Sequence, residues 1–210
     1  EKQIRLVFDQ AGVKKGLLVI VSGPSGVGKS TVVNRLLKIN PDLDLSVSAT
    51  TRPPRVMEKQ GKDYFFMSEK QFFEGVDKEE FLEWAQVHGA YYGTPKAYSQ
   101  NILEKGGTVI LEVDVQGAAK VKDIVTKGAL RSANAVFVFL IPPSVDILAF
   151  RLRRRKTEKT QELNYRLRAA VAELQVMEKY DYIVVNDKIE SAADKINAII
   201  RVEKERILIN

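Results

Sequence analysis

Short apolar runs alternate with helical patterns along most of the chain. The first run, LLVIVS at residues 17–22, ends at a glycine-rich turn, and an amphipathic stretch follows over about residues 29–39. Three further apolar runs end at Asp114, Ile141 and Asn186, and a helical pattern follows each of them. Because strands that alternate with helices form parallel sheets, the pattern predicts an α/β fold with a parallel β-sheet flanked by helices.

Two segments interrupt this alternation. Between about residues 48 and 101, the stretches TTRPPR, DYFFM and YYGTP break the pattern and predict an inserted α+β lobe. Near residues 151–166, charged and polar residues separate two helical patterns and indicate a mobile lid. Helical spacing of apolar residues then covers residues 161–180 and 190–207. We expect one domain over residues 1–210, with its core at about 17–47, 102–150 and 167–210.

The composition limits the classes of protein that fit. The chain has 210 residues, of which 45% are hydrophobic and 29% charged, and this suits one well-buried globular unit. It has no cysteine, which excludes a disulfide framework, a thiol nucleophile and a thiolate metal site. No apolar run reaches the ~20 residues that span a bilayer, and the start EKQIRLVFDQ lacks the apolar part of a signal peptide. We expect a cytoplasmic protein with no membrane partner.

The net charge of +6 raises nucleic acid as a possible partner. Positive charge is concentrated in RLRRRKTEK, residues 151–159, whereas the rest of the chain mixes both signs. A local cluster fits a compact polyphosphate as well as DNA, and it also fits a solvated helix face. The charge distribution therefore favours a phosphate-bearing small molecule over a nucleic acid.

The residues after the first predicted strand match the pattern G-x-x-x-x-G-K-S/T. They are Gly23, Pro24, Ser25, Gly26, Val27, Gly28, Lys29 and Ser30, with Thr31 next in the predicted helix. Glycines let the backbone curl so that N–H groups point at phosphate oxygens, and the helix adds the positive end of its dipole. We expect Lys29 to reach the β- and γ-phosphates, Ser30 to bind the Mg²⁺ that bridges them, and Thr31 to be structural. The loop predicts nucleoside triphosphate binding without identifying the acceptor.

Several segments beyond this phosphate loop occur in the order and spacing of one family. They are SVSATTRPPR at 46–55, GKDYFF at 61–66, FLEWAQVHGAYYGTP at 81–95, LEVDVQGA at 111–118, IPPS at 141–144 and VVND at 184–187. With the phosphate loop, they make the chain resemble the guanylate kinases over about residues 17–200. The resemblance implies a P-loop kinase that uses Mg²⁺ and transfers the γ-phosphoryl group of ATP to GMP, and to dGMP.

The resemblance also implies where the GMP phosphate binds. Arg52 and Arg55 would present guanidinium forks to it, and Tyr64 and Tyr92 would each donate a phenolic O–H. Taken alone, the two tyrosines fit core aromatics better than an anion site. Their place within the family pattern is what predicts an anion site in the lobe.

By the same resemblance, three residues read the guanine base. Glu83 would accept hydrogen bonds from N1–H and the exocyclic amino group, while Ser48 and Thr94 would contact the carbonyl edge. Adenine lacks that pair of donors and would leave a buried carboxylate unpaired. Glu83 is therefore the residue we expect to select the acceptor.

The family pattern assigns three arginines to the transferring group and one asparagine to adenine. Arg151, Arg155 and Arg166 would supply positive charge where the transition state spreads its negative charge. Asn186 would contact the adenine of ATP, although an ordinary strand-end turn is an alternative. Lys156 stands where many relatives have glycine, and the pattern leaves open whether it stiffens the lid or contacts phosphate.

Two carboxylates end the apolar run LEVD. Asp114 projects into the crevice at the strand end, where it could hold Mg²⁺ through water or contact the GMP ribose and base. Glu112, two residues earlier, faces the same side of the strand and stands where relatives often have aspartate. Both belong to the predicted GMP site, and their individual contacts stay open.

Three other functions remain as alternatives. Guanylate kinase-like modules of scaffold proteins bind peptides without catalysis, but they lack a competent phosphate loop, which is intact here. A P-loop kinase with another acceptor is disfavoured by Glu83, Ser48 and Thr94. A nucleic-acid-binding ATPase would rely on the basic run, which no platform of base-stacking aromatics accompanies.

Overall fold

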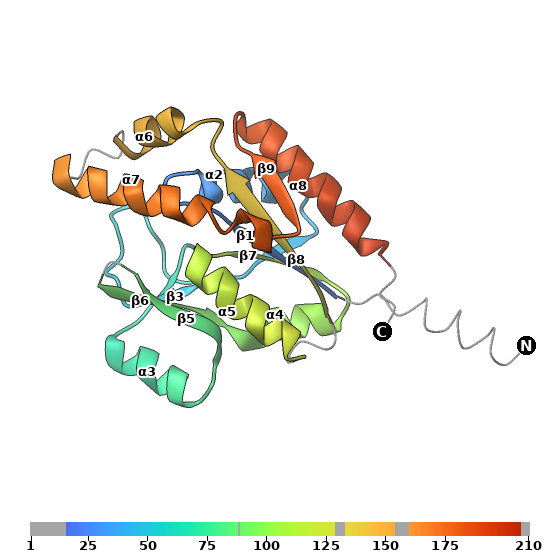
Figure 1. Cartoon of the computed structure of the whole chain (residues 1–210). Helices are drawn as coiled ribbons and strands as arrows, with labels where there is room; N and C mark the ends of the chain where they lie inside the picture. Colours follow the sequence, from blue (N-terminus) through green and yellow to red (C-terminus); the bar gives the residue numbers. More distant parts are fainter. Residues whose placement is uncertain (1–15, 88, 129–132, 154–159, 207–210) are drawn as a thin grey trace, which may run out of the picture.

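The computed structural model describes residues 16–87, 89–128, 133–153 and 160–206 (Figure 1). The segment with Arg155 and Lys156 lies outside these residues. Within them, no helix is long and apolar enough to cross a membrane.

A five-stranded parallel sheet forms the centre of the fold. Its strands follow the order β2-β7-β1-β8-β9. They are β1 (Gly16–Ser22), β2 (Leu43–Leu45), β7 (Thr108–Glu112), β8 (Ala133–Ile141) and β9 (Tyr182–Val185). The four predicted strands are confirmed, whereas the three-residue edge strand β2 was not predicted. In parallel sheets the carboxyl ends of the strands meet at one edge, so the polar residues at the ends of β1, β7 and β9 lie along the same edge.

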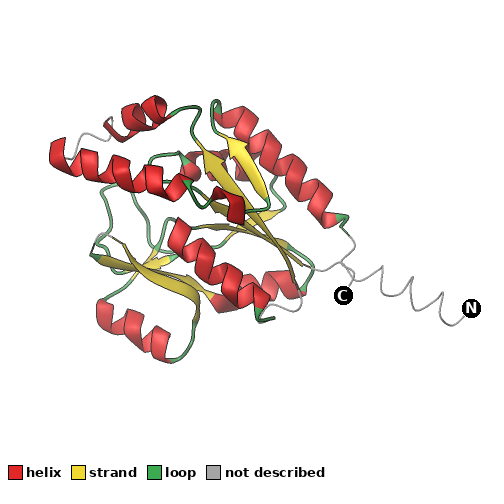
Figure 2. Cartoon of the chain, in the orientation of Figure 1, coloured by secondary structure: helices red, strands yellow, loops and turns green. Residues whose placement is uncertain are grey.

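Strand β1 is buried on both faces, which explains its unbroken apolar sequence. Leu17, Val19 and Val21 pack on one side of the sheet, and Leu18 and Ile20 pack on the other. The first side is covered by α2 (Lys29–Ile39) and α8 (Ile189–Lys204), and the second by α4 (Lys96–Glu104) and α5 (Val115–Thr126). Figure 2 shows helices in front of and behind the yellow strands of the central sheet.

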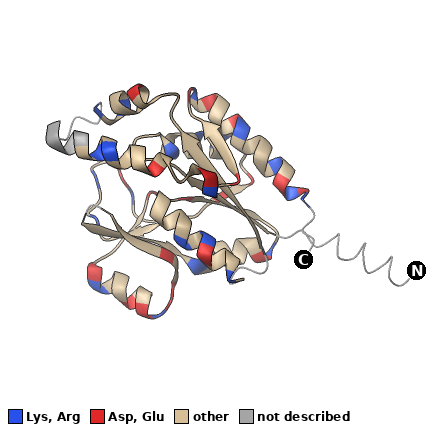
Figure 3. Cartoon of the chain, viewed as in Figure 1, with Lys and Arg blue, Asp and Glu red and all other residues tan. Residues whose placement is uncertain are grey.

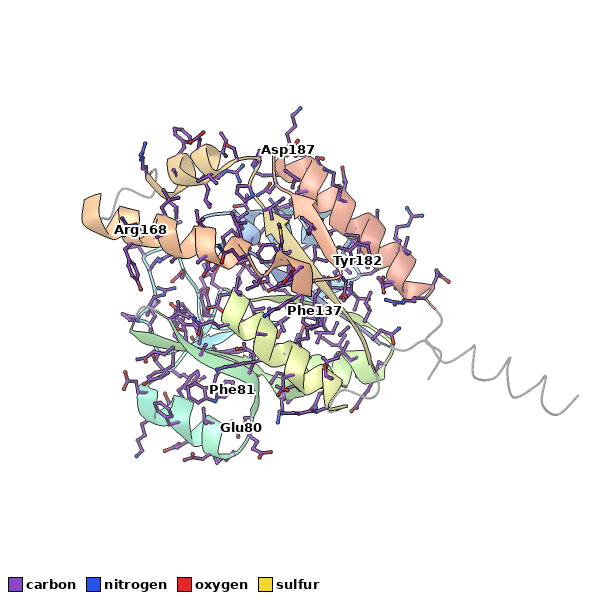
Figure 4. All side chains as sticks on the ribbon, in the orientation of Figure 1. Glu80, Phe81, Phe137, Arg168, Tyr182 and Asp187 are labelled. Atoms are coloured by element: carbon purple, nitrogen blue, oxygen red, sulfur yellow. The ribbon has the colours of Figure 1, made fainter. Side chains whose placement is uncertain are left out.

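A second sheet forms most of the predicted lobe. It has four strands in the order β4-β3-β6-β5 and is accompanied by α3. The elements are β3 (Ala49–Thr50), β4 (Phe65–Phe66), α3 (Glu69–Asp77), β5 (Phe81–Val87) and β6 (Ala90–Pro95). Figure 4 labels Phe81 between α3 and this sheet, where it stacks on Phe72 with ring centroids 4.7 Å apart. The sheet ends at Pro95, and α4 packs on β1 and β7, so the boundary expected at residue 101 falls inside a helix of the core.

Two helices lie across the end of the central sheet, above the lobe in Figure 1. They are α6 (Val145–Arg153) and α7 (Thr160–Leu174). The helix expected to continue to residue 180 ends at Leu174, and a 3-10 turn at Met177–Lys179 follows it. That turn lets Tyr180 pack against Phe139, with ring centroids 4.6 Å apart, before β9 begins. The expectation of a longer helix was wrong because this contact redirects the chain.

Charges of both signs are spread over the described surface. Figure 3 shows Lys and Arg interspersed with Asp and Glu along α5 and α8. Of the basic run at residues 151–159, the structure describes residues 151–153, at the end of α6.

Candidate active site

The phosphate loop connects β1 to α2 at the sheet edge. Gly23, Gly26 and Gly28 have φ values of 146°, 83° and 98°, a region that side chains with a Cβ rarely adopt. Close contacts add a second reason for glycine at position 23, because a Cβ there would lie 2.4 Å from the carbonyl oxygen of Leu140 on β8. The loop can therefore curl tightly over the ends of the strands.

Lys29 turns back over the loop that precedes it. Its Nζ donates to the carbonyl oxygens of Gly23 at 2.7 Å and Pro24 at 3.4 Å. These contacts hold an ammonium group at the mouth of the loop, where a bound phosphate chain would meet it.

Ser30, the next residue, faces a carboxylate at the end of β7. Its hydroxyl donates to Glu112 Oε1 at 2.5 Å. Burial raises the pKa of Glu112, and the Ser30 hydrogen bond and the charge of Lys29 oppose this without cancelling it. A hydroxyl and a carboxylate are hard oxygen ligands of the kind that Mg²⁺ prefers. Among the residues that the structure describes, no group of three or more His, Cys, Asp or Glu could hold a metal.

Arg151 and Asn186 tie the loop to α6 and to the end of β9. Arg151 donates to the carbonyl oxygens of Val27 at 3.0 Å and Asn186 at 2.9 Å. The Asn186 amide also donates to Val27 O, at 2.8 Å, and a Cβ on Gly28 would lie 2.8 Å from the amide nitrogen. The Oδ1 atom of Asn186 is buried without a hydrogen-bond partner, so it can accept a hydrogen bond from the exocyclic amine of a bound base.

Helix α7, which packs against α6, also contacts the loop. Arg166 Nη2 donates to Ser25 Oγ, and Glu173 Oε2 accepts from the Ser25 backbone N–H, both at 3.0 Å. Arg166 therefore stands beside the loop, as its predicted role requires. Nothing in the sequence pattern singled out Glu173.

The residues predicted to bind the GMP phosphate lie in the lobe, around Arg52. Its Nη2 contacts both carboxylate oxygens of Glu58 at 2.8 Å, and its Nη1 donates to the carbonyl oxygen of Pro53 at 2.7 Å. Burial raises the pKa of Glu58, but hydrogen bonds from the Arg55 backbone and from Arg52 outweigh it, so the carboxyl pKa lies below its usual value. Glu58 is thus ionised at neutral pH and orients the guanidinium.

The loop that carries Arg52 is fastened by the threonines before it. Thr50 Oγ1 donates to Tyr91 O at 2.9 Å and accepts from the Arg52 backbone at 3.1 Å. Thr51 Oγ1 accepts from the Tyr91 backbone at 2.9 Å, which ties the start of the loop to β6. Through these bonds Thr50 and Thr51 hold the start of the Arg52 loop against β6.

Two tyrosines border the same guanidinium. The Arg52 Cζ lies 5.5 Å from the ring centroid of Tyr64, whose ring packs edge-on against Tyr92 at 6.0 Å. Burial, and after it the charge of Glu112, raise the pKa of Tyr64. Glu112 also accepts the Ser30 hydrogen bond, so the charge of one carboxylate acts on both Tyr64 and the phosphate loop.

Two of the residues predicted to read the base form a buried polar pair. Glu83 is 8% exposed and Thr94 is fully buried, and the Thr94 hydroxyl donates to Glu83 Oε1 at 2.7 Å. Asp114 caps α5 by accepting from Gly117 N at 2.7 Å. A Cβ on residue 117 would lie 3.1 Å from Glu83 Oε2 and 3.3 Å from Asp114 Oδ1, so glycine lets both carboxylates approach the helix start.

These surroundings make Glu83 a weaker acid than an exposed glutamate. Burial raises its pKa to about 7, the charge of Asp114 adds to the shift, and the Thr94 hydrogen bond and Lys120 oppose it. Asp114 therefore lies beside Glu83, the residue predicted to bind the guanine base. Of the two contacts expected for Asp114, this position favours the one with GMP over the one with Mg²⁺.

The raised pKa of Glu83 predicts a pH-dependent stability. The unfolded carboxyl titrates near 4.5 and the folded one at about 7, so between these values the folded state binds more protons and stability falls as pH rises. The contribution is complete below about pH 4.5 and lost above about pH 7, with an upper bound of about 3 kcal/mol. We expect Glu83→Gln to raise the Tm relative to the native protein more at pH 8 than at pH 5. An equal change for Glu83→Gln at both pH values, matching that of the exposed control Glu104→Gln, would contradict the assignment.

Three further residues of the predicted site are half-buried or exposed. Ser48 is half-buried, and its carbonyl oxygen accepts from Phe65 N at 2.9 Å. Arg55 is exposed, and its backbone N–H donates to Glu58 at 2.8 Å. Thr31 is exposed in the first turn of α2.

Comparison with known proteins identifies the family. The guanylate kinase family model matches residues 15–203. The chain belongs to the guanylate kinase family. Two guanylate kinases at 46% identity come from Caldanaerobacter subterraneus subsp. tengcongensis, over 92% of this chain and 91% of the relative, and Halalkalibacterium halodurans, over 93% and 94%. The crystal structure of guanylate kinase from Anaplasma phagocytophilum superposes with a TM-score of 0.74 at 35% identity, covering 92% of this chain and 88% of that one.

Membership of the guanylate kinase family confirms the resemblance read from the sequence. It also confirms the α/β P-loop fold and the class of nucleoside monophosphate kinase.

Proposed function

We propose that this guanylate kinase transfers the γ-phosphoryl group of ATP to GMP, and also to dGMP, in a closed site that requires Mg²⁺. The observation that carries the proposal is the junction at Glu112. This carboxylate binds Ser30 of the phosphate loop, and its charge acts on Tyr64 of the arginine site. Donor and acceptor phosphates bound at the two sites would therefore meet.

On the ATP side, the phosphate loop and Lys29 bind the β- and γ-phosphates. Gly23 to Thr31 supply the loop and the helix start, and Asn186 presents its buried carbonyl oxygen to the adenine amino group. Ser30 fits a Mg²⁺ ligand, with Glu112 accepting from its hydroxyl or taking a place beside it. When bound, Mg²⁺ would neutralise the charge shared by the β- and γ-phosphate oxygens.

On the GMP side, Arg52 and Arg55 bind the monophosphate with Tyr64 and Tyr92. The two anion sites then hold both reacting groups, so that a GMP phosphate oxygen can attack in line. That oxygen already carries negative charge, and no general base is required.

The guanine base is read at the buried end of the lobe. Glu83 accepts from its N1–H and amino group, with Ser48 and Thr94 at the carbonyl edge and Asp114 beside Glu83. Since the pKa of Glu83 is about 7, the two guanine donors would favour the ionised form that can accept both bonds.

Positive charge for the transition state comes from Arg151 and Arg166, together with Arg155. Arg166 already lies 3.0 Å from the loop hydroxyl of Ser25. Arg151 donates to the carbonyl oxygens of Val27 in the phosphate loop and of Asn186 after β9, so it would exchange these partners to reach the transferring group. We further propose that the lobe at about 48–101 and the lid at about 151–166 close on the core and exclude water.

A panel of acceptors tests the function. ADP formation would be measured with ATP and Mg²⁺ against GMP, dGMP, AMP, CMP and UMP, and with Mg²⁺ removed by a chelator. We expect turnover with GMP and dGMP that depends on Mg²⁺. Equal, negligible turnover with every acceptor would favour a peptide-binding module. Binding to DNA that falls steeply with salt would contradict our proposal that this cytoplasmic protein has no nucleic-acid partner.

Glu58 provides a prediction for the monophosphate site. Glu58→Ala removes the carboxylate that orients Arg52 and leaves the guanidinium less firmly held, so we expect the KM for GMP to rise roughly 10-fold. The KM for ATP should stay within about twofold, because the phosphate loop is untouched. Steady-state kinetics with each nucleotide varied in turn measures both values, and Lys59→Ala on the same loop is the matched control. A lower KM for GMP would mean that Glu58 competes with the phosphate instead of positioning its receptor.

A further inference from the structure

Two side chains of helix α7 form hydrogen bonds with the same residue of the phosphate loop, Ser25. Glu173 accepts the backbone N–H of Ser25, and Arg166 donates to the Ser25 hydroxyl, each at 3.0 Å. The two residues are seven positions apart, about two helical turns, and so project from the same face of α7. One helix therefore holds Ser25 by its backbone and by its side chain.

A small apolar cluster supports this face of α7. Ala170, between the two polar residues, is fully buried and packs with Leu148 and Leu152 of α6. Leu152 also touches the loop, since a Cβ on Gly26 would lie 2.6 Å from its Cδ2. The cluster is small, with three fully buried members among the described residues. Polar contacts with the loop add to this apolar packing in placing α7.

We propose that Glu173 is a positioning residue for phosphoryl transfer: it fixes Ser25 of the phosphate loop to α7 and so keeps Arg166 beside the transferring group. The inference rests on the proposed function, which gives Arg166 its role. A carboxylate that accepts a backbone N–H makes a charge-assisted bond, which is stronger than a neutral one. Arg166 bonds to a rotatable hydroxyl, whereas Glu173 bonds to the backbone, so Glu173 sets the distance between helix and loop.

The size of the expected effect follows from the geometry of the reaction. A displacement of about 1 Å in a charged group at the reacting centre can cost about 100-fold in rate. We therefore expect Glu173→Ala to lower kcat by about 10- to 100-fold, with the KM for GMP within about twofold of the native value. Glu173→Gln keeps an acceptor oxygen for the Ser25 N–H, and its kcat should stay within about fivefold.

A double-mutant cycle with Arg166 separates positioning from simple loss of stability. If Glu173 acts through Arg166, then Glu173→Ala should cost less than about threefold further in an Arg166→Ala background. Matched controls are Glu178→Ala, an exposed carboxylate after α7, and Arg168→Ala, which is exposed on α7 and labelled in Figure 4. Both should keep the native kcat.

A measurement without turnover tests the anchor itself. Amide hydrogen exchange of peptides from α7 should be faster in nucleotide-free Glu173→Ala than in the native protein, and unchanged in Glu178→Ala. A native protein that does not phosphorylate GMP would refute the proposed function, and the exchange experiment would still decide whether the anchor exists.

Three results would overturn the inference. They are unchanged exchange together with a native kcat in Glu173→Ala, fully multiplicative losses in the double variant, and tighter ATP binding with no loss of kcat. The last would show that the carboxylate competes with a phosphate oxygen for the Ser25 N–H.

Discussion

Replacing Lys29 with methionine is expected to lower kcat for phosphoryl transfer by about 10²- to 10³-fold. The ammonium group lies at the mouth of the phosphate loop, held by the Gly23 and Pro24 carbonyl oxygens, where it would neutralise charge on the transferring group. Methionine fills a similar volume without charge, so packing at the helix start is retained. Steady-state turnover of ATP and GMP measures the loss.

Folding controls make this result specific to catalysis. The Tm of Lys29→Met should lie within a few degrees of the native value, because Lys29 is not part of the apolar core. Lys38→Ala, on the exposed face of the same helix, should keep the native kcat. A near-native kcat for Lys29→Met would remove Lys29 from the catalytic residues.

Glu83→Gln is expected to raise the KM for GMP by roughly 10- to 100-fold, at about 1.4 kcal/mol per factor of ten. The carboxylate can accept two hydrogen bonds from guanine, whereas the amide offers one acceptor and points a donor at another donor. Thr94 can still donate to the amide oxygen, so the pair within the lobe survives. Varying GMP at saturating ATP gives the value.

The KM for ATP distinguishes recognition from a structural role. It should stay within about twofold in Glu83→Gln, since the phosphate loop belongs to the other sheet. The control Glu104→Gln should leave both constants unchanged. An equal rise in both constants for Glu83→Gln would show that Glu83 maintains the structure of the lobe without reading the base.

Much of the fold could be predicted from the sequence because its strands are buried on both faces. The run from Leu17 to Ser22 is almost entirely apolar, because its two faces pack against two separate apolar clusters. The edge strand β2 escaped because three residues carry too short a pattern to detect. The end of α7 escaped because the apolar spacing continues past Leu174, whereas the chain turns there to pack Tyr180 on Phe139.

The candidate site was predictable where its residues are neighbours in the chain. The phosphate loop is a local motif, and its glycines adopt the positive φ angles that the pattern requires. The carboxylates Glu58 and Glu173 were missed because neither has a local signature. Glu58 follows its partner Arg52 by six residues in an irregular loop, and Glu173 is 148 residues from Ser25.

The sequence by itself determined the phosphate loop, the alternation of strands and helices, and the family, because each depends on residue types at short, fixed spacings. The tertiary structure alone decided which charged groups face one another. It joins Ser30 to Glu112 across 82 residues and Arg151 to Val27 across 124, and it buries Glu83 deeply enough to raise its pKa to about 7. Such pairings depend on how the strands are ordered in the sheet and on the exclusion of water, and no local pattern encodes either.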